Sequence, residues 1–149
     1  MKEILILLPI IIGFLISRLY NKKGFNYIKS KLQPPGYVFS IVWSILYILI
    51  GVSYYIGLNK QETKYYIIPV LGLIFNYLYT PLFFGYKQIL YSMIIVILTL
   101  LFTILTIIQF YYSNVNKYAI YLLIPYLIWL IFALILSVDI YVKNKKFNY

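Results

Sequence analysis

The sequence predicts an all-α integral membrane protein, folded as a five-transmembrane-helix bundle. Hydrophobic residues make up 64% of the 149-residue chain, whereas charged residues make up only 11%. The mean hydropathy of +0.90 lies far outside the range of soluble domains. The apolar runs are continuous rather than alternating, which excludes a transmembrane β-barrel. Composition and pattern therefore indicate helices that cross a membrane, and the lipid bilayer is the first partner that the sequence predicts.

The uncharged stretches locate these helices. A helix needs about 20 residues to cross the hydrocarbon core of a bilayer. Four stretches have this length, and the first is extended to Tyr20 because Arg18 can snorkel to the interface. The uncharged stretches are 4–17, 32–59, 65–86, 88–116 and 118–138. We therefore predict spans over about 4–20, 37–58, 65–84, 89–112 and 118–142, which make residues 1–149 a single transmembrane domain.

The first apolar stretch has an alternative interpretation. Ile4–Ser17 has the length of the apolar region of a cleaved signal peptide. The residues that follow, Arg18, Leu19 and Tyr20, are bulky and basic, whereas a cleavage site needs small residues. We therefore favour a transmembrane helix for this segment.

The net charge of +10 predicts the orientation of the bundle. Five spans place the first loop, the third loop and the C-terminus on one side. That side carries nine basic residues: Arg18, Lys22, Lys23, Lys29, Lys31, Lys87, Lys143, Lys145 and Lys146. The other side carries four: Lys2, Lys60, Lys64 and Lys117. The positive-inside rule then predicts a cytoplasmic C-terminus and first loop, in a membrane that the sequence does not specify.

Residue types that are absent restrict the chemistry. The chain has no Cys and no His, so a thiol nucleophile, a disulfide, a zinc site and a histidine-ligated haem are excluded. Its acids are Glu3, Glu62 and Asp139, which are too separated to form a catalytic pair. We expect Asp139 to pair with Lys143, one turn further on. No catalytic residue and no metal ligand is predicted, so a non-enzyme is favoured. A nucleic-acid partner is not expected, because loop 21–33 is too short to form a basic platform.

Several polar and aromatic side chains inside the spans need an interpretation. Thr99, Thr103 and Thr106 recur at helical spacing, and we expect them to form a packing face with hydroxyls bonded to their own backbone. Asn76 must find a partner in hydrocarbon, either as a staple between helices or as part of a pocket. Nine tyrosines near the span ends are assigned to interfacial belts: Tyr54, Tyr55, Tyr65, Tyr66, Tyr111, Tyr112, Tyr118, Tyr141 and Tyr149.

The two tryptophans, Trp43 and Trp129, have two interpretations. They either fill the core of the bundle or line a cavity in it. Close helix contacts in membranes usually use small residues, because burial in lipid is not driven by the hydrophobic effect. Bulky aromatics that face inward therefore favour space between helices. On the last span, Pro125, Trp129, Phe132 or Ala133, and Leu136 recur on one face.

Four motifs, taken in order, resemble one known family. The first motif is Gln33–Pro34–Pro35–Gly36–Tyr37–Val38–Phe39, followed by Val42–Trp43 and Leu46–Tyr47. Its tandem prolines begin a helix on which Trp43 and Tyr47 lie one turn apart. This segment resembles the PPxxxFxxVWxxLY motif of the TspO/MBR family, the tryptophan-rich sensory or translocator proteins. Three further segments resemble later motifs of that family: Asn76–Gly85, Gln88–Tyr91 and Pro125–Ser137. The resemblance covers roughly residues 33–141.

This resemblance implies a five-helix bundle with a ligand pocket open toward the first loop. Family members bind tetrapyrroles such as protoporphyrin, and some bind cholesterol. Transferred by motif position, the ligand-binding residues are Trp43, Tyr47, Asn76, Tyr79, Tyr91, Ile94, Leu98, Trp129, Ala133 and Leu136. The resemblance thus implies a membrane-embedded binding protein for tetrapyrroles or sterol-like ligands, with a transport or regulatory role. Protoporphyrin is the expected ligand, no cofactor is obligatory, and a homodimer is expected by resemblance.

The first loop departs from the family pattern WYxxLxKPxWxPP. Lys23 and Leu32 stand where its two tryptophans are aligned, and Phe25 and Tyr27 are the candidates to replace them. Those loop tryptophans are linked in the family to light-dependent porphyrin breakdown, so their absence favours binding over chemistry. Two alternatives stay open: an enzyme that degrades porphyrin with light and oxygen, and a helical assembly subunit without ligand.

Overall fold

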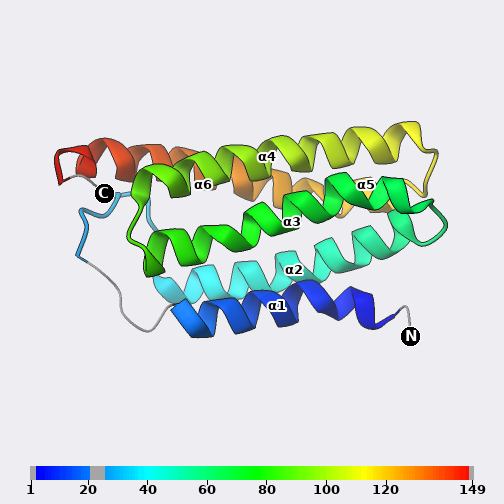
Figure 1. Ribbon diagram of the computed structural model, residues 1–149, viewed down its shortest axis with the longest axis horizontal. Helices are drawn as coiled ribbons and strands as arrows, with labels where there is room; N and C mark the ends of the chain where they lie inside the picture. Colours follow the sequence, from blue (N-terminus) through cyan, green and yellow to red (C-terminus); the bar gives the residue numbers. More distant parts are fainter. Residues whose placement is uncertain (1–2, 21–25, 148–149) are drawn as a thin grey trace.

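A computed structural model describes residues 3–20 and 26–147 of the chain. All regular structure in these residues is helical, which confirms the all-α prediction. Five helices run back and forth along the long axis of the molecule, with short helical turns at their ends (Figure 1). The elements are α1 (Ile4–Tyr20), α2 (Gly36–Leu58), η1 (Thr63–Tyr66), α3 (Ile67–Thr80), η2 (Pro81–Gly85), α4 (Ile89–Tyr112), α5 (Tyr118–Tyr121), α6 (Ile124–Asn144) and η3 (Lys145–Phe147).

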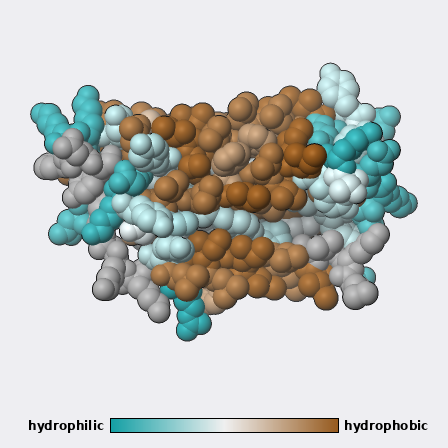
Figure 2. All heavy atoms as spheres, in the orientation of Figure 1, coloured by the Kyte–Doolittle hydropathy of each residue, from teal (hydrophilic) through white to brown (hydrophobic). Residues whose placement is uncertain are grey.

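The lengths and compositions of these helices suit a bilayer. Within the described residues, four helical segments are long and apolar enough to cross a membrane: 36–58, 63–85, 89–112 and 118–144. The first helix is apolar but shorter. Figure 2 shows the result on the surface, where hydrophobic residues fill the middle of the molecule and hydrophilic residues gather at its two ends. A protein with this surface needs a hydrocarbon environment around its middle.

Two of the segments are interrupted by proline. After α3, Pro81 begins the single π-helical turn η2, in which the Tyr86 N–H donates to the Pro81 carbonyl oxygen at 2.9 Å. A proline inside a helix clashes with the preceding turn, and a widened turn relieves that clash. Near the last span, Pro125 lies in the first turn of α6, where its missing N–H is tolerated. The predicted fifth span, 118–142, corresponds to the apolar segment 118–144, which consists of α5 and α6 with a short turn between them.

The helices close a ring in the order α1, α2, α6, α4, α3. The α1–α2, α3–α4 and α4–α6 pairs pack extensively, α1 also contacts α3, and α2 contacts α5. By contrast, α2 and α6 contact each other little. The C-terminal end of α6, residues 26–35 and the turn into α4 lie at one end of the bundle (Figure 1). This end is called the first-loop end below.

Successive long helices run in opposite directions (Figure 1), and the predicted asymmetry of basic residues between the two ends depends on this alternation. The side of the membrane that each end faces stays a prediction. Lys2, Lys22 and Lys23, which contribute to the count of basic residues, lie outside the described residues.

Threonine hydroxyls are hidden within α4, as the sequence predicts. Thr99, Thr103 and Thr106 are at most 2% exposed. Each hydroxyl donates to the carbonyl oxygen four residues earlier at 2.8 Å. These side chains present methyl groups and satisfied hydroxyls to the neighbouring helices, which allows close packing in a membrane.

Candidate functional site

A buried amide joins three helices near the centre of the bundle. Asn76 on α3 is 7% exposed. Its Oδ1 accepts a hydrogen bond from the Tyr47 hydroxyl of α2 at 2.7 Å, and its Nδ2 donates to the Tyr126 hydroxyl of α6 at 2.9 Å. An amide without partners would be costly in hydrocarbon, so the staple interpretation of Asn76 is confirmed. Tyr126 was not among the residues predicted from the motifs.

The two tryptophans meet beside this staple. Trp43 lies with its ring centroid 5.3 Å from Tyr47, 6.2 Å from Tyr126 and 6.5 Å from Trp129. Trp129 also contacts Phe39 at 5.8 Å. Most of these pairs are edge-to-face, the arrangement that aromatic quadrupoles favour. The fold thus brings together four of the predicted residues, Trp43, Tyr47, Asn76 and Trp129, although they come from three helices.

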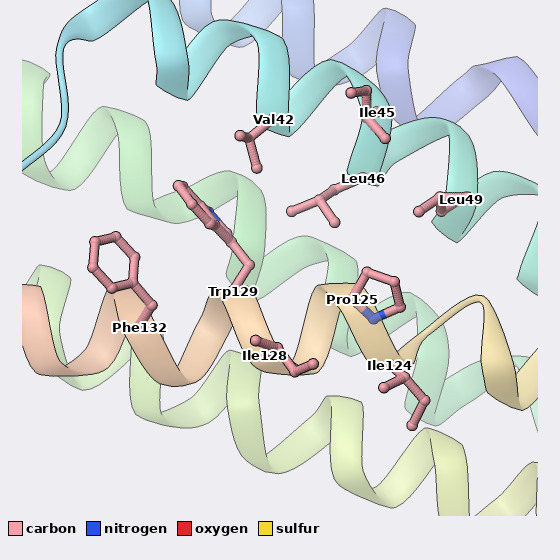
Figure 3. A pocket seen from close by; sticks show the side chains of 9 residues that line it. All are labelled: Val42, Ile45, Leu46, Leu49, Ile124, Pro125, Ile128, Trp129 and Phe132. Atoms are coloured by element: carbon pink, nitrogen blue, oxygen red, sulfur yellow. The ribbon is translucent and has the colours of Figure 1, made fainter.

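A cavity of about 590 Å³ lies between α2 and α6. Its walls are almost entirely apolar, and Trp129 projects from α6 across it toward Val42 and Leu46 of α2 (Figure 3). The lining residues are Val42, Ile45, Leu46, Leu49, Ile124, Pro125, Ile128, Trp129 and Phe132. Pro125, Trp129 and Phe132 therefore lie on the one helix face that the spacing predicted. Of the two candidates for the third position, Phe132 lines the cavity and Ala133 does not.

One polar atom of the cavity wall lacks a partner. The indole Nε1 of Trp129 is buried and makes no hydrogen bond to any described residue. Buried N–H groups are nearly always paired, so this one is an exception. It has almost no accessible surface, so it does not face the open space of the cavity.

The remaining predicted residues divide into two groups. Tyr79 and Leu136 lie nearer the first-loop end, in a cluster with Phe83 and Ile140, where Tyr79 stacks on Phe83 at 5.5 Å. The residues of α4 do not join the site in this structure. Tyr91 and Ile94 are 56% and 40% exposed on the outer surface. Leu98 and Ala133 are half-buried, and neither lines the cavity.

The first loop closes over this cluster at the first-loop end. Tyr27, one of the two candidates to replace the loop tryptophans, packs edge-on against Phe83 at 5.1 Å. Phe25, the other candidate, lies outside the described residues. Nearby, Lys143 Nζ lies 2.8 Å from Asp139 Oδ2, so the predicted ion pair is confirmed.

Asn144 holds the same loop from the end of α6. It is 1% exposed, and its side-chain amide bonds the backbone of Ile28 in both directions. Sequence reasoning missed this residue, because the only signal is a polar amide at the end of an apolar span. The many apolar cavity residues, such as Ile45 and Ile128, carry no signal of their own in a sequence where every face is apolar.

These features define a multi-pass integral membrane protein, a bundle of five helices with an aromatic core and an apolar cavity between two of them. The model of the TspO/MBR family matches residues 5–142, and the chain belongs to that family. It is 36% identical to the tryptophan-rich protein TspO of Archaeoglobus fulgidus, covering 78% of this chain and 76% of that protein.

Relatives with other names align as well. The chain is 29% identical to the translocator protein of Sus scrofa, covering 93% of this chain and 87% of that protein. It is 32% identical to the tryptophan-rich sensory protein of Cereibacter sphaeroides, covering 70% and 65%. The family resemblance predicted from the motifs is therefore confirmed.

Proposed function

We propose that this protein binds a tetrapyrrole, protoporphyrin or a similar flat apolar molecule, in the space between α2 and α6 beside the two tryptophans. The observation that carries the proposal is the apolar cavity of about 590 Å³ with Trp129 in its wall. Sites for small molecules usually measure roughly 300–1,000 Å³ and combine apolar walls with a few polar groups. The cavity has this size, and its walls are apolar.

Aromatic contacts supply much of the expected affinity. A flat macrocycle gains about 0.5–1.5 kcal/mol for each well-placed aromatic contact, beyond the burial of its apolar area. Trp129, Phe132 and the neighbouring Trp43 offer several such contacts. Together with burial, they are sufficient for the roughly −8 kcal/mol that corresponds to micromolar binding.

The polar groups of the ligand would find their partners at the end of the bundle. Carboxylates at one edge of the ligand would pair with lysines of the first-loop end, of which Lys29 and Lys31 are exposed. No His is available to ligate iron, so recognition rests on shape, apolar contact and these polar groups.

The names of the relatives suggest how binding is used. One group of relatives is named translocator protein and another tryptophan-rich sensory protein. We therefore extend the proposal to a transport or regulatory role for the bound ligand, with sterol-like molecules as a second ligand class that the same apolar walls suit.

The test is a titration of the purified protein in detergent with protoporphyrin and, separately, with haem, followed by porphyrin absorbance. We expect saturable binding near the micromolar range, with little preference for haem over the free base. Absence of saturable binding would contradict the proposal. Haem that binds about a hundredfold tighter, roughly 2.7 kcal/mol, would require an axial ligand and a different site. Consumption of bound porphyrin in light and oxygen, abolished by replacing Trp43 or Trp129, would establish the enzyme alternative.

A further inference from the structure

Two routes lead into the bundle, one through the first-loop end and one through the seam between α2 and α6. We infer that the ligand enters sideways from the bilayer through the α2–α6 seam, past Trp129, while the first-loop end stays closed. This inference rests on the proposed function, since it concerns how the same site is loaded.

The first-loop end is fastened by a buried amide. Asn144 Oδ1 accepts from the Ile28 backbone N–H at 2.8 Å, and Asn144 Nδ2 donates to the Ile28 carbonyl oxygen at 2.9 Å. The same Nδ2 donates to the Ile140 carbonyl oxygen at 2.8 Å. Both donors and the acceptor of this amide are therefore used. Lifting the loop would break the two bonds to Ile28, while the bond to Ile140 within α6 would remain.

Aromatic packing reinforces this closure. The Tyr27 ring lies on Phe83, which is only 3% exposed. The Tyr27 hydroxyl accepts a hydrogen bond from Gln33 Nε2 at 2.9 Å, which ties the loop to the residue before the tandem prolines. Opening the loop would expose Phe83, Leu136 and Ile140 to water, because this end of the bundle carries the hydrophilic surface.

The seam between α2 and α6 is held by ring contacts of Trp43 with Trp129 and Tyr126. Asn76 of α3 also bonds Tyr47 of α2 and Tyr126 of α6. In the described part of the chain, no hydrogen bond runs directly from one of these helices to the other. A direct hydrogen bond to the last span is found at the far end of α2, where the Ser53 hydroxyl donates to the Ala119 carbonyl oxygen of α5 at 2.6 Å. The cavity lies between α2 and α6 next to these ring contacts.

The cavity opens to the outside of the bundle at the depth of the hydrocarbon core. Ile45 on one wall is 53% exposed, and Ile128 on the other is 62% exposed. Ile45 lies well inside α2, and Ile128 lies in the second turn of α6 but well inside the apolar segment 118–144, so the surface around them is in contact with lipid tails. An apolar macrocycle dissolved in the bilayer can reach this opening without passing through water, and separating apolar walls in lipid exposes nothing that lipid disfavours.

Trp129 lies between the opening and the core. It forms part of the cavity wall, and it also contacts Phe39 and Trp43 inside the bundle. A ligand that comes in through the seam therefore passes the exposed Ile45 and Ile128 before it reaches the Trp129 ring. We assign to Trp129 the role of a positioning residue at the inner side of this entrance.

The test uses the absence of cysteine from the chain, since introduced cysteines are then the only reactive thiols. One variant carries Ile45→Cys and Ile128→Cys, on opposite walls of the seam. The matched control carries Ile28→Cys and Lys145→Cys, which tether the exposed first loop to the end of α6. Each pair is bridged by a short, cleavable thiol cross-linker, and the rate of protoporphyrin uptake from loaded lipid vesicles is measured before bridging, after bridging and after cleavage.

We expect the seam bridge to slow uptake by about tenfold or more, within the range over which association rates vary among variants, with recovery on cleavage. The loop bridge should leave uptake within about twofold of the unbridged protein. Slow uptake with the loop bridge, or normal uptake with the seam bridge in protein that still binds protoporphyrin, would overturn the inference alone. If none of the proteins, parent chain included, bound protoporphyrin at equilibrium, the proposed function would fail and the inference with it.

A second variant does not depend on cross-linking. Asn144→Leu removes the amide that fastens the loop, and entry through the seam predicts an unchanged uptake rate. A faster rate would show that the loop is the entrance.

Discussion

Helix α2 packs differently on its two sides. Toward α1 it presents Gly51, where any Cβ would collide with the Ile6 carbonyl oxygen, and α1 in turn presents Gly13 to the Tyr47 ring. Toward α6 it presents Leu46 and Leu49, opposite Trp129 and other large side chains. The first contact brings two backbones together, and the second leaves about 590 Å³ between helices.

The difference shows how a membrane bundle can keep a cavity. Lipid tails are as apolar as the side chains, so no hydrophobic force presses helices together, and close packing depends on small residues. Where the sequence places glycine, α2 approaches its neighbour. Where it places tryptophan and leucine, α2 stands apart, and the space that results is the proposed ligand site.

The largest effect is expected from breaking the close contact. Gly51→Leu must push α1 away from α2, because the obstructing atom belongs to the backbone of Ile6. We expect the free energy of unfolding in detergent to fall by about 3 kcal/mol, the upper part of the usual overpacking range. The matched control is Gly36→Leu, since a Cβ at Gly36 meets nothing within 4 Å. Equal thermal stability of the two variants would contradict a close α1–α2 contact.

A smaller effect is expected in the open contact. Trp129→Leu removes one aromatic surface from the cavity wall and should weaken protoporphyrin binding by about 1–2 kcal/mol, which is roughly a 5–30-fold rise in Kd. Tyr112→Leu is the control, because Tyr112 is 79% exposed at the opposite end of the bundle. The two Kd values are measured by the same titration. If Tyr112→Leu weakened binding as much as Trp129→Leu, the loss of affinity could not be attributed to the cavity.

The smallest effect concerns the staple between the two contacts. Asn76→Leu removes the hydrogen bonds to Tyr47 and Tyr126. Hydrogen bonds between membrane helices contribute on average about 0.6 kcal/mol each, so a loss of stability near 1 kcal/mol is expected. A double-mutant cycle with Tyr47→Phe measures the coupling. Strictly additive losses would mean that the Tyr47–Asn76 bond does not contribute to stability.

Much of the bundle could be predicted from the sequence, because charges and prolines mark helix ends plainly. Asn76 and the threonines of α4 were also predictable, since a polar group in hydrocarbon must find a partner. The break between α5 and α6 was not predicted, although Pro125 marks it, because membrane helices tolerate proline in several ways.

The cavity itself was harder to predict. In a soluble helix the apolar stripe identifies the inner face, but here lipid-facing and inward faces are equally apolar. Trp129 was found through its motif, whereas Ile45 and Ile128 carry no such mark. The Asn144–Ile28 contact joins residues 116 positions apart, and a local sequence pattern does not predict such a long-range contact.

The most direct measurement of the central claim uses the two tryptophans of the chain. Their ring centroids lie 6.5 Å apart beside the cavity, so no distant tryptophan dilutes the signal. Protoporphyrin bound between α2 and α6 should quench most of the tryptophan fluorescence, and the quenching should saturate together with the porphyrin absorbance change. Tryptophan emission that stays unquenched at saturating protoporphyrin would place the binding site elsewhere and contradict the account.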